Sequence, residues 1–128
     1  MTGFTDNIER LTLENTYFRK VIHTAPHSQL VLMNLKPGEV IGSEIHSELD
    51  QFFRFEQGHG QVVIDGEERN VEDGDAAIVP AGAEHNVINT SETEDLKLYT
   101  VYSPPQHPDG TIHETKAEAD AAEAAESH

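Results

Sequence analysis

Short apolar runs separated by turn-forming residues dominate the middle of the chain. The runs are rich in β-branched and aromatic residues and stop at Gly, Pro, Asn or Asp, which predicts β-strands. Asp65-Gly66 is a strong two-residue hairpin signal. The even spacing, without a helical period between runs, favours an antiparallel sandwich or barrel over a parallel α/β sheet. The predicted strands span residues 16–23, 29–35, 50–56, 61–64, 67–71, 75–79, 84–89 and 96–103.

The two ends of the chain do not share this pattern. Residues 1–15 carry a weak apolar pattern that fits an N-terminal arm or a short helix. Residues 104–128 begin as a Pro/Gly loop and end in an Ala- and Glu-rich tail from position 114. The tail has strong helix formers but no apolar face, so we expect a frayed helix or a disordered tail. One β domain over 16–103 follows, with an arm and a polar tail.

Polar side chains gather on predicted inward faces. Successive side chains of a strand point to opposite faces, so Glu44 and His46 share one face. Gln51 and His85 lie at the starts of two other strands, and in a small barrel all these faces can point inward. The same alternation places four further residues beside Gln51 and His85, namely Phe53, Phe55, Val87 and Asn89.

This donor set is typical of a site for one divalent metal ion. A carboxylate, an amide oxygen and two imidazoles suit a hard-to-borderline ion and leave coordination positions open for water or substrate. The chain has no cysteine, which excludes disulfides, thiolate metal sites and cysteine nucleophiles. The alternatives are that His46 and His85 are ordinary core residues, that Glu44 faces solvent, and that Gln51 is a barrel residue bonded to its neighbours.

Two stretches resemble the two motifs of the cupin superfamily, over about residues 28–103. Glu44 and Gln51 stand where the first motif has a histidine and a glutamate, and both keep a ligand oxygen. The second motif matches at every defined position. The matching positions are Gly38, His46 and Gly58 in the first motif, and Gly74, Pro80, Gly82, His85 and Asn89 in the second.

The resemblance implies an all-β fold, a cupin-type antiparallel β-barrel or double-sheet jelly roll. The sequence is similar to small single-domain cupins of the mannose-6-phosphate isomerase-like kind. By this resemblance one divalent ion (Zn, Ni, Mn, Fe or Cu) is held by Glu44, His46, Gln51 and His85. It also implies a homodimer, for which we expect the apolar runs 16–23 and 29–35 to supply edge strands.

The sequence pattern does not single out a general base. Tyr102 and Glu48 are the candidate catalytic residues, with Thr100 on the same predicted face as Tyr102. Glu48 fits a turn better than a site, and it is a reserve ligand if the strand register differs. His59 between two glycines is expected in an exposed hairpin. The group of His107, Asp109 and His113 has the composition of a metal site, but its Pro/Gly setting favours a structured loop.

Charge narrows the range of partners. The chain carries 24 acidic against 8 basic residues, a formal net charge of -16 over 128 residues, which disfavours nucleic acid and anionic membranes. No apolar run is long enough to span a bilayer, and the first residues lack a secretory signal. We therefore expect a cytoplasmic protein that takes a small-molecule substrate or ligand.

Three functions stay open on sequence grounds. The first is redox-neutral isomerisation, tautomerisation or lyase chemistry on a keto sugar, uronate or dicarbonyl. The second is a metal-dependent dioxygenase, and the third a non-catalytic metal or small-ligand binding module. Gln51 replaces the carboxylate that several cupin oxygenases use as an acid/base, which ranks the first above the second.

Overall fold

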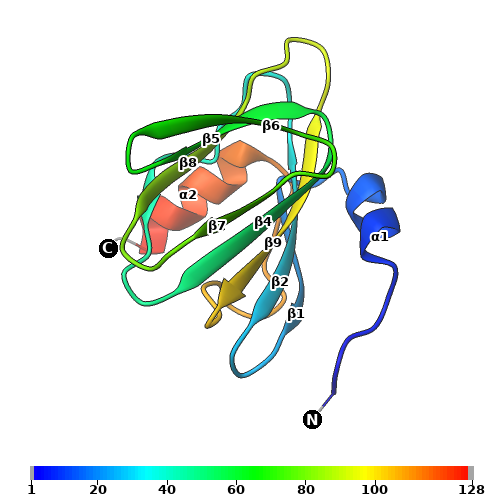
Figure 1. Cartoon of the computed structure of the whole chain (residues 1–128). Coiled ribbons are helices and arrows are strands. Elements are labelled where there is room, and N and C mark those ends of the chain that lie inside the picture. Colours follow the sequence, from blue (N-terminus) through cyan, green and yellow to red (C-terminus); the bar gives the residue numbers. More distant parts are fainter. Residues whose placement is uncertain (1, 127–128) are drawn as a thin grey trace.

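Two antiparallel sheets face each other in a computed structural model of the chain, which describes residues 2–126 (Figure 1). The larger sheet has the strand order β10-β1-β2-β9-β4-β7, and the smaller sheet has the order β3-β8-β5-β6. The larger sheet contains β1 (Arg19–Thr24), β2 (Gln29–Leu35), β4 (Asp50–Gln57), β7 (Ala76–Val79), β9 (Leu96–Ser103) and β10 (Ile112–His113). The smaller sheet contains β3 (Glu44–Ile45), β5 (His59–Ile64), β6 (Glu67–Glu72) and β8 (Glu84–Asn89). The predicted double-sheet architecture is confirmed.

Burial alternates along the strands as the sequence pattern predicts. Gln51, Phe53 and Phe55 are buried on β4, while the residues between them are only half-buried. His85 and Val87 are buried in the same way on β8. The hydrophobic core therefore lies between the two sheets, where residues from both inner faces meet.

The turn at Pro80 holds two distant parts of the chain together. Gly82 adopts a φ of +90°, which strains any residue with a Cβ, and its N–H donates to the carbonyl of His46 at 2.9 Å. The Ala81 N–H donates to Asp50 Oδ1 at 2.9 Å. These bonds join the segment before β8 to the segment between β3 and β4, and so bring His46 close to the start of β8.

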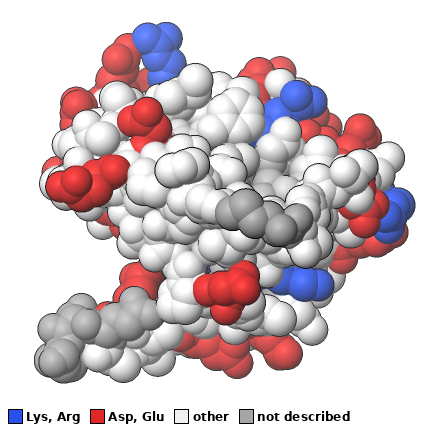
Figure 2. Space-filling model, turned by 90° about the horizontal axis from the view of Figure 1, so that it is seen from below, with Lys and Arg blue, Asp and Glu red and all other residues white. Residues whose placement is uncertain are grey.

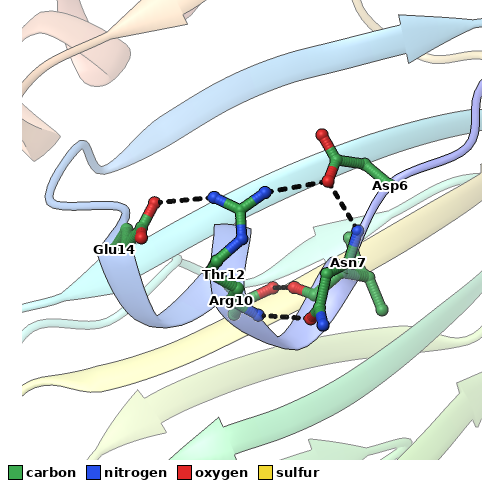
Figure 3. A network of polar contacts seen from close by, with 6 residues as sticks. Asp6, Asn7, Arg10, Thr12 and Glu14 are labelled. Carbon is green, nitrogen blue, oxygen red and sulfur yellow. Dashed lines mark hydrogen bonds and ion pairs between the residues drawn. The ribbon is translucent and has the colours of Figure 1, made fainter.

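The N-terminal helix α1 (Ile8–Glu14) is secured by local polar contacts (Figure 3). Asn7 caps it by accepting from the Arg10 N–H at 2.9 Å. The Arg10 guanidinium bridges Asp6 and Glu14, one turn away on either side. Beyond the helix, Lys97 Nζ on β9 donates to the Asn15 carbonyl at 2.6 Å, which ties α1 to the larger sheet.

The C-terminal segment is more ordered than the sequence predicts. It pairs with β1 through the short strand β10, which aligns Arg19 with His113, and continues into the helix α2 (Lys116–Glu126). Ala119 on α2 is 1% exposed and belongs to the core. The expectation that the tail buries nothing is therefore wrong at Ala119, whose methyl group needs no wide apolar stripe to pack.

The strands expected at the sheet edges are not edge strands. Strand β2 lies between β1 and β9, and β1 is itself covered by β10 over Arg19 and Lys20. Strand β10, which covers β1, lies in a Pro/Gly-rich region. It has only two residues, which is too short to show an alternating strand pattern in the sequence. The outer strands of the larger sheet are β10 and β7, and Ile78 on β7 is 67% exposed.

Acidic side chains are spread over the face of the molecule shown in Figure 2, in keeping with the strong negative net charge. Within residues 2–126, no helix combines the length and the apolar character that crossing a membrane requires.

Candidate metal centre

Glu44, His46 and His85 meet at one end of the space between the sheets. One potential ligand atom from each lies within 4.8 Å of the others, so the group could bind a metal. Glu44 on β3 is paired directly with His85 on β8, and His46 follows two residues after Glu44. Two of the three ligands are thus cross-strand neighbours, and the turn at Gly82 holds the third.

The orientation of the two histidines suits metal binding. His85 Nδ1 lies 3.2 Å from the Ala83 carbonyl; with Nδ1 protonated, it donates this bond and Nε2 keeps a free lone pair. His46 Nε2 lies 2.8 Å from Glu44 Oε2, yet within the described part of the chain this buried nitrogen has no partner in hydrogen-bond geometry. The two atoms approach each other without being aligned, as two ligands of one ion would.

Electrostatics keep the Glu44 carboxyl ionised. Burial by itself would raise its pKa, but the neighbouring His46 and the more distant Arg19 outweigh burial, and the pKa of Glu44 is lowered. An anionic carboxylate beside two imidazoles is the protonation state that a divalent ion requires.

Gln51 offers a further oxygen at this end of the barrel. Its Nε2 donates to Thr100 Oγ1 at 3.0 Å, and the Thr100 hydroxyl donates onward to the Phe52 carbonyl at 2.8 Å. This chain of bonds orients the amide and leaves Gln51 Oε1 buried without a hydrogen-bond partner in residues 2–126. Buried polar atoms are rarely left unpaired, and a metal ion would satisfy this one.

The donor set fits a divalent metal ion. Two imidazoles, one carboxylate and one unpaired amide oxygen combine the ligands that Zn, Ni, Mn, Fe and Cu accept in proteins. The structural observation that supports this fit is that Gln51 Oε1 and His46 Nε2 are buried and, among the described residues, have no partner in hydrogen-bond geometry.

Tyr102 and Glu48, the two candidate catalytic residues, have contrasting surroundings. Tyr102 is 3% exposed, pairs with Gln51 across the sheet, and its ring lies edge-on to His46 at 6.0 Å between centroids. Burial raises its pKa above the usual value, and the Glu44 carboxylate adds to this effect. Glu48 is exposed between β3 and β4 and is not part of the group formed by Glu44, His46 and His85.

Residues from the C-terminal segment also line this end of the barrel. His107 Nε2 lies 3.3 Å from the Tyr102 hydroxyl, and burial, helped by Arg19, lowers the pKa of His107 to about 4. Asp109 is exposed, so the sequence group of His107, Asp109 and His113 does not converge on one point. The composition of this segment suggested a functional role, but no local sequence pattern predicts that His107 contacts Tyr102.

Arg19 is a residue that the sequence analysis missed. Its side chain is 2% exposed, and Nη1 lies 3.3 Å from His113 Nδ1 and 3.7 Å from Glu123 Oε1 of α2. The one available signal was strand alternation, since Arg19 shares the inward face of β1 with Val21. A cation on an inward face is unusual enough to be noticed, although alternation does not say what it meets.

Comparison with known proteins agrees with this geometry. The chain is 52% identical to the uncharacterized protein YrkC of Bacillus subtilis (strain 168) over 126 residues, covering 94% of this chain and 67% of the relative. A crystal structure of BH2720 from Bacillus halodurans is 47% identical with a TM-score of 0.91, covering 94% of this chain and 95% of the other. The structure of KdgF from Halomonas sp. is 26% identical with a TM-score of 0.64, covering 69% and 78%.

A model of the cupin domain matches residues 31–102, which include the three grouped ligands together with Gln51, Thr100 and Tyr102. With two facing antiparallel sheets and the ligand group between them, this chain belongs to the cupin family, as one of its small members.

Proposed function

We propose that this cupin binds one divalent metal ion through Glu44, His46, Gln51 and His85 and acts on a small oxygen-rich molecule by redox-neutral chemistry. A keto sugar, a uronate or a dicarbonyl is the substrate class, and isomerisation, tautomerisation or a lyase reaction is the reaction type. The observation that carries the proposal is the buried Gln51 Oε1, which has no hydrogen-bond partner within residues 2–126 and belongs to the larger sheet, while Glu44 and His85 belong to the smaller sheet that faces it.

The bound ion would polarise a carbonyl or hydroxyl oxygen of the substrate. Gln51 carries no charge, so it orients and binds but does not take up a proton. The Thr100 hydroxyl accepts a hydrogen bond from the Gln51 amide nitrogen and so fixes the amide group. The site therefore lacks the carboxylate acid/base that oxygen insertion would use at this position, which supports the redox-neutral assignment.

Tyr102 and His107 provide a proton donor and a proton acceptor side by side. Burial keeps the Tyr102 phenol protonated and His107 neutral at neutral pH, since the pKa of Tyr102 is raised and that of His107 is lowered to about 4. The phenol has a single proton, which it can donate either to a substrate oxygen or to the imidazole nitrogen 3.3 Å away, but not to both at once. We assign the proton transfer of the reaction to this pair and leave Glu48 without a role, because it is exposed outside the group.

The test compares separately loaded forms of the protein on a panel of keto sugars, uronates and dicarbonyls. The form loaded with redox-inert Zn is expected to turn over at least one substrate without consuming oxygen, as are forms with Ni, Mn or Fe(II). Turnover that needs a redox-active ion and consumes stoichiometric oxygen would instead establish a dioxygenase. Tyr102→Phe should lose turnover while keeping metal content, and Tyr99→Phe, on the other face of the same strand, is the matched control.

The homodimer remains a prediction. Exposed Ile78 on the outer strand β7 is a better candidate for its contact than β1 or β2. Light scattering at micromolar concentration should give twice the monomer mass, and Ile78→Lys should lower it. A cytoplasmic location likewise remains a prediction.

A further inference from the structure

Two glutamines flank Tyr102 on the inner face of the larger sheet. In the strand register, Tyr102 of β9 lies between Gln51 of β4 and Gln29 of β2. All three side chains are buried, with exposed fractions of 3% or less. Gln51 belongs to the proposed ligand set, whereas Gln29 lies on the other side of Tyr102 and has no part in metal binding. Its burial beside the site therefore needs a separate explanation.

The Gln29 amide is fully hydrogen-bonded. Its Oε1 accepts from the backbone N–H groups of Gln106 at 3.2 Å and His107 at 3.0 Å. Its Nε2 donates to the His107 carbonyl at 2.7 Å and to Thr24 Oγ1 at 3.0 Å. A primary amide has two N–H donors and two acceptor lone pairs, so no capacity is left for a ligand. Gln29 thus binds another part of the chain, whereas Gln51 Oε1 has no such partner.

The bonds from Gln29 fix the backbone at His107. They hold both its N–H and its carbonyl, in the segment 104–111 that joins β9 to β10. The side chains on either side, Gln106 and Pro108, are exposed, so packing does little to hold this part of the segment. With the backbone held, the imidazole has only its side-chain torsions left, and it lies edge-on to Tyr102 at 5.1 Å between ring centroids.

This arrangement connects Gln29 to the candidate metal centre by direct contacts. The ring of His46 lies 6.0 Å from that of Tyr102, and the Tyr102 hydroxyl lies 3.3 Å from His107 Nε2. A hydrogen bond of 3.3 Å is already long, so a small shift of the His107 backbone would break it. The contact between Tyr102 and His107 therefore depends on what holds the backbone.

We propose that Gln29 is a positioning residue, which holds the backbone at His107 so that Nε2 of the imidazole faces the Tyr102 hydroxyl. The use of this contact for proton transfer rests on the proposed function, but the positioning itself is measurable without turnover. Gln29 and His107 both lie outside the region 31–102 that matches the cupin domain, so the interaction is not among the features that define that match.

A purely structural role for Gln29 makes a different prediction. If Gln29 only added stability, its loss would lower the melting temperature and leave the ring of His107 in place, since β10 still pairs with β1 and the ring still packs on Tyr102. The tautomer of His107 distinguishes the two roles. In a neutral imidazole the bond made by one nitrogen decides which nitrogen carries the proton, so a phenol donating to Nε2 leaves the proton on Nδ1.

The experiment records imidazole ¹⁵N spectra of the full-length protein at about pH 8, where histidines are neutral, with and without Zn. The His107 signals, assigned by their loss in His107→Gln, are expected to show the Nδ1–H tautomer in wild type. Gln29→Met, which keeps the volume but removes all four bonds, should give a mixture of both tautomers. Thr24→Val is the matched control, because it removes only the bond that does not reach the segment 104–111.

Turnover gives a second readout on any substrate that the Zn form converts. Gln29→Met is expected to lower kcat about tenfold or more while KM changes less than about twofold, because a misplaced proton-transfer group affects the transition state rather than binding. Gln106→Met, which replaces an exposed glutamine of the same segment, should leave both constants unchanged.

Hydrogen exchange of the wild-type protein keeps the test valid even if Gln29→Met does not fold. The backbone N–H groups of Gln106 and His107 should exchange at least about tenfold more slowly than in an unstructured chain, because Gln29 accepts from both. Unprotected N–H groups, or an unchanged His107 tautomer in folded Gln29→Met, would overturn the inference. A changed tautomer without turnover by any metal form would keep the positioning and remove the enzymatic function. Turnover that is unaffected in Gln29→Met would overturn the use of His107 in the reaction and leave the proposed metal chemistry standing.

Discussion

The space between the sheets has two ends with opposite chemistry, although the same strands line both. On β4 and β9 the pair Gln51 and Tyr102 faces one end, and the pair Phe55 and Leu98 faces the other. Strand β8 repeats the change only in part, because His85 at its start is followed by Val87 but the buried residue at its end is Asn89. The apolar end excludes water from both sheets and stabilises the fold, while the polar end has unpaired ligand atoms that add nothing to stability until something binds them.

This division predicts that substitutions at the two ends separate stability from metal binding. A change at the apolar end should destabilise the protein and leave the ligand group intact. A change at the polar end should do the reverse.

The largest effect is expected from Phe55→Ala at the apolar end. Phe55 is fully buried, so removing its ring loses the free energy gained by transferring the ring out of water, and it also leaves a cavity. Together these effects should lower the free energy of unfolding by about 3–5 kcal/mol. Urea denaturation measures the change, and Phe52→Ala on the outer face of β4, where the residue is only half-buried, is the milder control. Below its melting temperature Phe55→Ala should still bind metal, and a loss of both properties would mean that the two ends are not independent.

His85→Ala at the polar end should lower metal affinity by more than about 100-fold, since loss of an outer-shell partner alone typically costs 10–100-fold. The β-rich circular dichroism spectrum should be retained, because the core residues are unchanged. Metal content after dialysis measures the effect, with the exposed His59→Ala as control. Wild-type protein that takes up less than about a tenth of an equivalent of any transition metal would contradict the metal centre itself.

A smaller effect is expected from the titration of His107 in metal-free protein. Unfolded His107 binds a proton below about pH 6.5, whereas the folded protein resists protonation until about pH 4, chiefly because the residue is buried. The unfolded state binds more protons in this window, so the free energy of unfolding falls as the pH drops from 6.5 to about 4, by on the order of 2 kcal/mol from this residue.

Urea denaturation of His107→Gln across this window should show a shallower pH dependence than wild type. His59→Gln, which replaces an exposed histidine, should follow the wild-type curve. Identical curves for all three proteins would show that His107 titrates normally.

The smallest effect concerns how α2 is attached. Ala119→Asp places a charge where the side chain is 1% exposed and should detach the helix, at a cost of about 1 kcal/mol or roughly 3–5 °C in melting temperature. Ala121→Asp makes the same change on the exposed side of α2 and should have almost no effect. A drop of ten degrees or more from Ala119→Asp would mean that α2 contributes to the fold as much as a core strand does.

The predicted strands show how far local pattern reaches in this protein. The ranges 29–35, 84–89 and 96–103 agree with β2, β8 and β9 to the residue. The inward set of Gln51, Phe53 and Phe55 also follows from alternation alone. The sequence likewise led to Glu44, His46 and His85 as a group, through strand alternation and the resemblance of two motifs, and the structure pairs Glu44 directly with His85.

The sequence by itself determined most strands and the inward faces that carry the ligand group, because these depend on backbone alternation and on turns that a few neighbouring residues specify. Only the tertiary structure decided where the C-terminal segment packs. Arg19 meets His113 across 94 positions of sequence, through a strand of two residues, and Glu123 arrives from a helix held by one buried alanine. Such contacts leave no local pattern, since they arise where the chain returns to a strand it left about ninety residues earlier.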